Sequence, residues 1–176
     1  MNRTELERLL RGPEPDQQPD QQRLGVFGIS ATCPGGADRV LTGTREVLSV
    51  VLRRDADAWP TDQEWAEILP QWFVGCCAPE RTEQEKQDWL RWWQGLSWPE
   101  KQLRMQESKP SVGDWVYWFL PEMRKWYWWD TAVTDEAHLW VEIEVEDWPV
   151  PWDALRWLLR CAGATDVRLG SDPPPQ

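Results

Sequence analysis

Several residue types are scarce in this chain of 176 residues. It has one His, three Phe, two Tyr and three Met, and Leu, Ile, Val and Phe together make up about a fifth of it. Combined with a formal net charge of −11, this low aliphatic content is close to that of disordered chains. The single histidine, His138, excludes metal sites built from several imidazoles, and the sequence predicts neither a metal nor another cofactor.

Basic residues are too few for nucleic-acid binding. Lys and Arg number 19 against 30 Asp and Glu, whereas neutralising phosphates requires clustered cations. The chain also lacks an apolar run long enough to cross a membrane, and its start does not resemble a signal peptide. Cys33, Cys76, Cys77 and Cys161 follow no repeated spacing, which indicates reduced thiols in a cytoplasmic protein.

Tryptophan compensates for the missing aliphatic residues. The chain contains 16 Trp, and each buried indole removes roughly 150–250 Å² from water. This abundance predicts a globular chain whose interior is built largely of indole rings. Because 16 rings exceed what a core of this size needs, several of them should stay partly exposed.

The two ends of the chain are predicted to lie outside the globular domain. "TELERLL" is typical of a short helix with Thr4 as its N-cap and Glu7 completing a capping box. The segment "RGPEPDQQPDQQ" that follows has no apolar residue, which indicates a flexible linker. We therefore expect a helix and linker over residues 1–22, one globular domain over 23–170, and a disordered tail over 171–176.

Residues 23–54 allow two interpretations. "RLGVFGIS" is rich in Val, Ile and Phe between glycines and indicates a strand. "EVLSVVLRR" (46–54) could be a second strand, but Val47, Val50, Val51 and Arg54 also fall on one helical stripe. Both alternatives stay open for this segment.

A layer of short Trp-rich helices is predicted over residues 59–120. Capping boxes begin two of them, Thr61 with Glu64 and Thr82 with Glu85, and Ser97 and Ser111 are N-caps of two more. Aromatic residues recur at helical spacing after these caps, as in Trp65, Ile68, Leu69, Trp72 and Phe73 or Trp89, Trp92 and Trp93. Pro70 must end or kink the helix in which it lies.

The last third, residues 124–169, predicts a sheet with a crossover helix. "AHLWVEIEV" (137–145) alternates apolar and polar residues, and "WPVPWDALRWLLRCAG" follows as a helix that ends before Gly163. "TDVRLG" is a short final strand, and this strand-helix-strand unit favours parallel pairing. The predicted fold class is α+β, or α/β, with a small mixed sheet that contains an antiparallel hairpin over residues 126–146.

The register of this hairpin determines where the ring-rich segment "KWYWWDTAV" faces. With a loop of two or four residues, Trp126, Trp128 and Asp130 share a face with Val145, Ile143 and Val141. A loop of three or five residues reverses the two faces of the first strand. In the even register the opposite face carries Tyr127, Trp129, His138, Trp140, Glu142 and Glu144. We call these six residues the aromatic–acidic face.

The aromatic–acidic face is the candidate binding site. Either the helical layer covers it, or it binds a partner, and Trp and Tyr beside Glu suit an Arg or Lys of another protein. With no catalytic motif in the chain, the leading hypothesis is a non-enzymatic acidic interaction module for a basic protein, such as an inhibitor or immunity-type protein.

Two further functional hypotheses stay open. The first is a small-ligand or carbohydrate-binding domain that uses Trp129, Trp140, Glu142 and Glu144, with the two carboxylates able to support hydrolysis. The second is an accessory subunit of a larger complex, with residues 1–22 as its tether.

Overall fold

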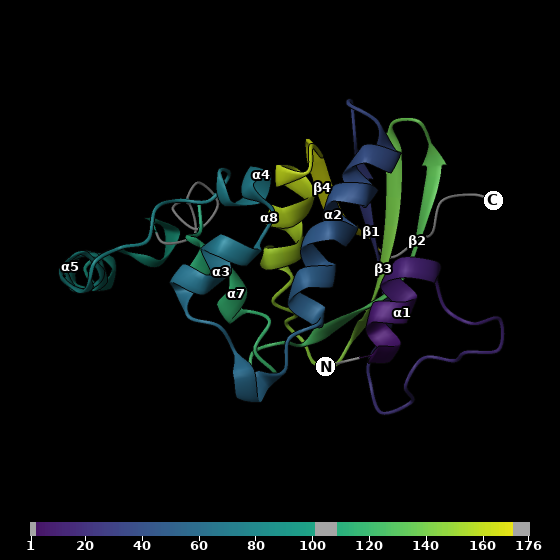
Figure 1. Cartoon of the computed structure of the whole chain (residues 1–176), viewed down its shortest axis with the longest axis horizontal. Coiled ribbons are helices and arrows are strands. Elements are labelled where there is room, and N and C mark those ends of the chain that lie inside the picture. The colour runs from purple at the N-terminus through teal and green to yellow at the C-terminus, as the bar shows by residue number, and fades with distance from the viewer. Residues whose placement is uncertain (1–2, 101–108, 171–176) are drawn as a thin grey trace.

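The centre of the fold is a four-stranded sheet whose neighbouring strands are all antiparallel. The computed structural model describes residues 3–100 and 109–170. The strands are β1 (Gly25–Thr32), β2 (Trp126–Asp135), β3 (His138–Val145) and β4 (Asp166–Gly170), in the spatial order β2-β3-β1-β4 (Figure 1). The predicted α+β class and the 126–146 hairpin are confirmed. The prediction of a mixed sheet is wrong.

The predicted parallel pairing in the last third is also wrong. β4 pairs with β1 and not with β3, so β3 and β4 run in the same direction with β1 between them. A strand-helix-strand unit fixes the direction of its two strands but not their adjacency, and β1 arrives from more than 100 residues earlier in the chain. The resulting β-α-β-β-α-β order is the split β-α-β, or ferredoxin-like, arrangement.

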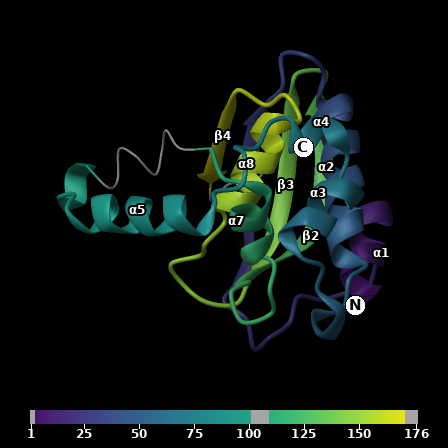
Figure 2. The same cartoon turned by 60° about the vertical axis from the view of Figure 1, so that its left-hand side comes forward.

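Two helices cover one face of this sheet, α2 (Ala37–Leu52) and α8 (Asp153–Cys161) (Figures 1 and 2). The open question over residues 46–54 is therefore settled as a helix through Leu52. Val47 and Val51 of the predicted stripe are buried together with Leu48, whereas Val50 is only partly buried and Arg54 lies beyond the helix. α8 ends close to its predicted boundary, and Gly163 follows it with a φ of 120°.

The chain between α2 and β2 forms further helices outside the sheet. They are η1 (Ala56–Ala58), α3 (Asp62–Ile68), α4 (Gln71–Val74), α5 (Glu83–Gln94) and α7 (Val112–Tyr117). The capping boxes at Thr61 and Thr82 are confirmed, and the Ser111 hydroxyl accepts a hydrogen bond from the backbone N–H of Asp114. Pro70 separates α3 from α4, as its missing N–H requires. Among the described helices none is long and apolar enough to span a bilayer.

Indole rings form much of the interior, as predicted. Trp65, Trp115, Trp126 and Trp128 are at most 1% exposed. A chain of ring contacts runs through Phe73, Trp115, Phe119 and Trp126, with centroid separations of 4.5, 4.6 and 5.7 Å. Aromatic packing therefore joins the inserted helices to β2.

The hairpin has the even register at its open end. Trp126 pairs with Val145 and Trp128 with Ile143, so both rings face the core as predicted. A β-bulge at Trp129 then shifts the register, and Asp130 pairs with Glu142. The prediction that Asp130 shares a face with Val141 is wrong because the bulge inserts one extra residue and turns that carboxylate away from the apolar face.

The N-terminal helix belongs to the fold. α1 (Arg3–Arg11) packs against β2, at the edge of the sheet, and against α2. Glu5 and Leu9 are fully buried, which differs from the expectation that residues 1–22 lie outside the domain. Thr4 lies inside the helix and is not its N-cap, and Glu7 pairs with Arg3 at 3.1 Å between Nε and Oε1.

Candidate functional site

The structure brings most of the aromatic–acidic face together on the side of the sheet away from α2 and α8. Tyr127 on β2 pairs with Glu144 on β3, while Trp140 and Glu142 lie further along β3. His138 lies at the far end of β3, next to the hairpin turn. The expected grouping is therefore present, except that Trp129 occupies the bulge.

Glu144 is at the centre of a cluster that buries this face. Only 1% of Glu144 is exposed. One carboxylate oxygen accepts a hydrogen bond from the backbone N–H of Asp20, and the other accepts one from Arg23 Nη1. Arg8 Nη2 lies 3.8 Å from the same carboxylate. Two guanidinium groups therefore compensate a buried carboxylate, which would otherwise be costly to desolvate.

The same two arginines also contact the aromatic rings. The Arg23 guanidinium lies 3.7 Å from the centroid of Tyr127, and that of Arg8 lies 4.9 Å from Trp129. The Tyr127 hydroxyl donates a hydrogen bond of 3.0 Å to Glu146, and burial raises the pKa of Tyr127 above its ordinary value. Cations do bind the aromatic–acidic face, as its composition favours, but they come from this chain.

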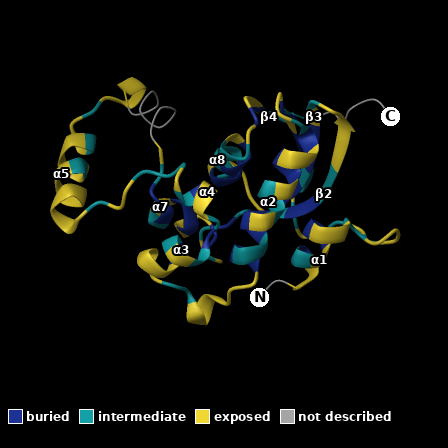
Figure 3. Cartoon of the chain, turned by 45° about the horizontal axis from the view of Figure 1, so that its top comes forward, coloured by how far each residue is buried: buried dark blue, intermediate teal, exposed yellow. Residues whose placement is uncertain are grey.

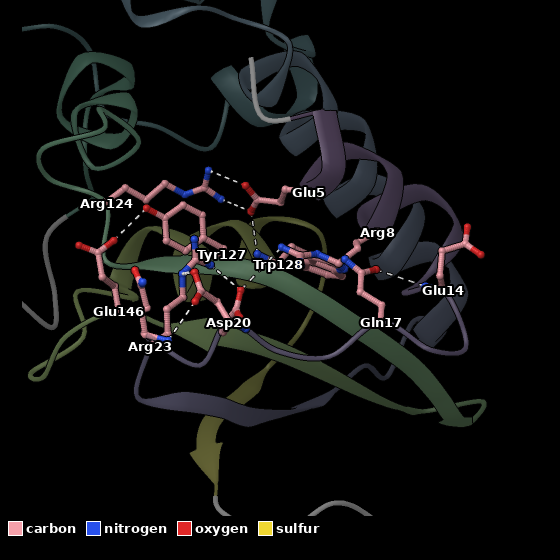
Figure 4. Close-up of polar contacts among 12 residues, drawn as sticks. Glu5, Arg8, Glu14, Gln17, Asp20, Arg23, Arg124, Tyr127, Trp128 and Glu146 are labelled. Carbon is pink, nitrogen blue, oxygen red and sulfur yellow. Dashed lines mark hydrogen bonds and ion pairs between the residues drawn. The ribbon is translucent and has the colours of Figure 1, made fainter.

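The segment that covers this face is therefore the N-terminal one. Helix α1 supplies Arg8, and the segment between α1 and β1 supplies Asp20 and Arg23 (Figure 4). Both alternatives in the sequence analysis, cover by the helical layer or by a partner, differ from this arrangement. The absence of apolar residues and the repeated Pro and Gln predicted a flexible linker over residues 11–22. This local pattern does not reveal that the backbone N–H of Asp20 and the side chain of Arg23 bind Glu144, which is distant in the sequence.

The ring of Trp140, on β3, lies over Gly28 of the neighbouring strand β1. Its indole N–H donates a hydrogen bond of 3.2 Å to Glu142 Oε1 on the same face. Gly28 of β1 leaves space for the ring, since a Cβ at that position would lie 1.8 Å from Trp140 Cζ2. Trp140 is almost fully buried, so it is not an open platform for a sugar ring.

We expect Gly28→Ala to lower the free energy of unfolding by about 1–3 kcal/mol, because the added methyl group must displace the Trp140 ring. Gly170→Ala is the matched control, since Gly170 is the pairing partner of Gly28 on β4 and a Cβ there contacts nothing within 4 Å. Urea unfolding of both variants measures the difference. Equal stabilities would show that Trp140 moves without cost.

His138 has a local structural role at the hairpin turn. Its Nδ1 lies 2.8 Å from both carboxylate oxygens of Asp135. The backbone N–H of Ala137, and then the His138 ring, hold the pKa of Asp135 below its ordinary value. His138 is exposed and separate from the Glu144 cluster, so it is not part of a shared site.

The second candidate surface is α5, which projects away from the sheet and its helices (Figures 2 and 3). None of its residues is buried. We call residues 82–98 the α5 arm. Trp92 and Trp98 are 47% and 66% exposed, Leu90 is also exposed, and the rings of Trp89 and Trp93 stack at 5.1 Å. The helical layer was predicted to pack these rings, but the arm extends beyond the core.

Basic side chains on and beside the arm already have acidic partners within the chain. Arg81 pairs with Asp114, Lys86 with Glu83 and Arg91 with Asp88, at N···O distances of 3.5, 3.3 and 2.5 Å. The backbone N–H of Thr82, and then its hydroxyl, lower the pKa of Glu85 and keep this carboxylate ionised. The arm thus carries exposed aromatic rings, and each of its basic side chains named here is paired with a carboxylate.

A cavity of about 580 Å³ lies between α1, the end of α2 and the start of β2. Three arginines line it, Arg3, Arg54 and Arg124, together with the rings of Trp59, Phe119 and Tyr127. Its volume is in the range of small-ligand sites. However, Arg3 is paired with Glu7 and Arg124 with Glu5, so two of the three guanidinium groups already bind carboxylates.

Within residues 3–100 and 109–170 no group of three or more His, Cys, Asp or Glu is arranged to hold a metal ion. Comparisons of the chain with models of protein families, with curated proteins and with solved structures find no match.

Proposed function

We propose that this protein is a non-enzymatic interaction module that binds a basic protein partner through the α5 arm. The observation that carries the proposal is the exposure of Leu90 and Trp92 on α5, a helix with no buried residue, and of Trp98 just after it. Exposed rings gathered on a projecting helix are costly to leave in water and are typical of binding surfaces. Trp is also among the residues most often found at interface hot spots.

The charge of the chain determines the kind of partner. A net charge of −11 favours association with a basic surface and disfavours self-association through repulsion. The partner is expected to offer an apolar pocket for an indole, surrounded by Lys and Arg. Inhibitor and immunity-type proteins are modules of this kind.

The aromatic–acidic face supports this function less well, because Arg8 and Arg23 already occupy it. The alternative of a small-ligand domain would use the cavity beside Arg54 and not Trp129, Trp140 or Glu144. The tether function proposed for residues 1–22 is disfavoured by the burial of Glu5 and Leu9.

Site-specific photo-crosslinking tests the proposal. A photoreactive phenylalanine analogue placed at Trp92, in cells of the source organism, should yield one stoichiometric adduct with a basic protein. Trp148 is the matched control, since it is an exposed tryptophan of similar accessibility, at 58%, in the β3–α8 loop. Adducts of equal yield at both positions would contradict a specific surface.

The purified partner then allows a quantitative test. Trp92→Ala should raise the Kd by at least about 10-fold, as expected for a hot-spot ring, whereas Trp148→Ala should leave it unchanged. Added salt should weaken binding further if the partner is basic. A Kd that is insensitive to Trp92→Ala would exclude the α5 arm.

A further inference from the structure

Three of the four cysteines lie together at the base of the α5 arm, although their positions in the sequence suggest no such grouping. Cys76 and Cys77 follow α4, and Cys161 is the last residue of α8. Cys76 and Cys161 line the same cavity, and the neighbouring Cys76 and Cys77 thiols add to the effect of burial in raising the pKa of Cys161. All three are partly exposed and reduced, whereas Cys33 is buried.

Cys76 and Cys161 line one cavity of about 300 Å³. Lys109, Trp157 and Arg160 also line it, so two cations lie beside the two thiols. A small anionic reagent can therefore reach the pair, and the cations favour both its charge and a transient thiolate. The neighbouring backbone forms the base of the arm, where the N–H of Ala78 donates a hydrogen bond of 2.9 Å to the carbonyl of Pro110.

We propose that Cys76 and Cys161 form a reversible disulfide that fastens the base of the α5 arm to α8 in response to small-molecule disulfides. Because the described residues include no metal-binding cluster, the pair is better suited to thiol–disulfide exchange than to a metal ion. This inference goes beyond the proposed function, since it concerns how the arm is held and not what it binds.

Glutathione disulfide would oxidise the pair in two exchanges. The Cys76 thiolate attacks one sulfur of glutathione disulfide, which forms a mixed disulfide and releases one glutathione thiolate. The Cys161 thiolate then attacks Cys76 Sγ, which forms the protein disulfide and releases the second glutathione. The two protein thiols lose two electrons and two protons, and glutathione disulfide takes up both.

The order of the two attacks follows from the surroundings of the thiols. Burial, and then the neighbouring thiols, raise the pKa of Cys161, so its thiolate is rare and Cys161 is a poor first nucleophile. Burial also raises the pKa of Cys77 to about 11, which makes Cys77 a poor first nucleophile. Cys76 is therefore assigned the first attack, and the shared cavity places Cys161 beside it for the second.

The test uses the full chain in glutathione buffers of increasing oxidised fraction, followed by alkylation under denaturing conditions and mass spectrometry. We expect two fewer alkylated cysteines, a cross-linked peptide that contains Cys76 and Cys161, and full reversal by dithiothreitol. Cys76→Ser and Cys161→Ser should abolish the cross-link. Cys33→Ser and Cys77→Ser should leave it unchanged, and thermal melting confirms that each variant is folded.

Two results would overturn the inference. One is that all four cysteines stay alkylatable in the most oxidising buffer while the protein is folded. The other is that the cross-link joins Cys77 to Cys161 or joins two chains. Neither result bears on partner binding at Trp92, so the two proposals fail independently.

Discussion

Glu5→Ala should lower the free energy of unfolding by about 3–5 kcal/mol, the cost typical of breaking a buried ion pair. Glu5 is fully buried, and its carboxylate accepts hydrogen bonds from both Nη atoms of Arg124, which is 6% exposed. The same carboxylate accepts a hydrogen bond of 2.7 Å from the backbone N–H of Trp128 on the edge strand. Without Glu5, a buried guanidinium and a strand N–H both lose a charged acceptor.

A matched control and a double variant separate the ion pair from the helix itself. Glu7→Ala lies on the same helix, where Glu7 forms only an exposed pair with Arg3, and should change stability by about 0.5 kcal/mol or less. Combining Glu5→Leu with Arg124→Met should recover part of the loss, because the buried charge is removed along with its partner. Urea denaturation with intrinsic tryptophan fluorescence measures all three variants.

A small effect of Glu5→Ala would show that α1 contributes little to the edge of the sheet. An effect of the same size in Glu7→Ala would instead show that the loss comes from helix propensity. Either result would contradict the structural role assigned to the Glu5–Arg124 pair.

Local features of this fold could be predicted from the sequence because short-range physics determines them. Capping boxes at Thr61 and Thr82 satisfy N–H groups within one turn, and Pro70 interrupts a helix at its own position. The period of two in β3 places Val141, Ile143 and Val145 on one face whatever their partners are. The same period predicted that Trp126 and Trp128 are buried.

Features that depend on distant segments could not be predicted. The position of β1 between β3 and β4 requires a pairing choice among strands, and no local pattern encodes that choice. The bulge at Trp129 reverses the faces of the residues after it, although nothing in "WYWWD" announces an extra residue. The exposure of the Trp residues on α5 could not be predicted either, because aromatic residues at helical spacing form the same sequence pattern on a buried helix and on a projecting one.

The composition of the aromatic–acidic face predicted the kind of ligand but not its origin. Glu144, Tyr127 and Trp129 favour a guanidinium, and two guanidinium groups are bound there. An arginine in the same chain has a high effective concentration at this face, so it outcompetes a weakly bound partner. Sequence patterns reveal the affinity of a surface for a chemical group more readily than the chain that supplies it.

Glu144→Ala should therefore both destabilise the fold, by about 3 kcal/mol, and release the segment between α1 and β1. Arg8 and Arg23 would lose their shared carboxylate, and the N–H of Asp20 its acceptor. Trypsin cleavage after Arg23 should then accelerate by at least about 10-fold, because cleavage follows the population of the opened segment. Mass spectrometry of the cleavage products over time measures this rate.

Glu142→Ala is the matched control for this release, since Glu142 lies on the same strand face but accepts only the Trp140 indole N–H. It should cost about 1 kcal/mol and leave cleavage at Arg23 unchanged. Selective cleavage in Glu144→Ala would show that one carboxylate holds the segment over the sheet. If both variants are cleaved at the rate of the wild type, contacts other than Arg8 and Arg23 close this face, and a basic partner could not open it by competing for Glu144.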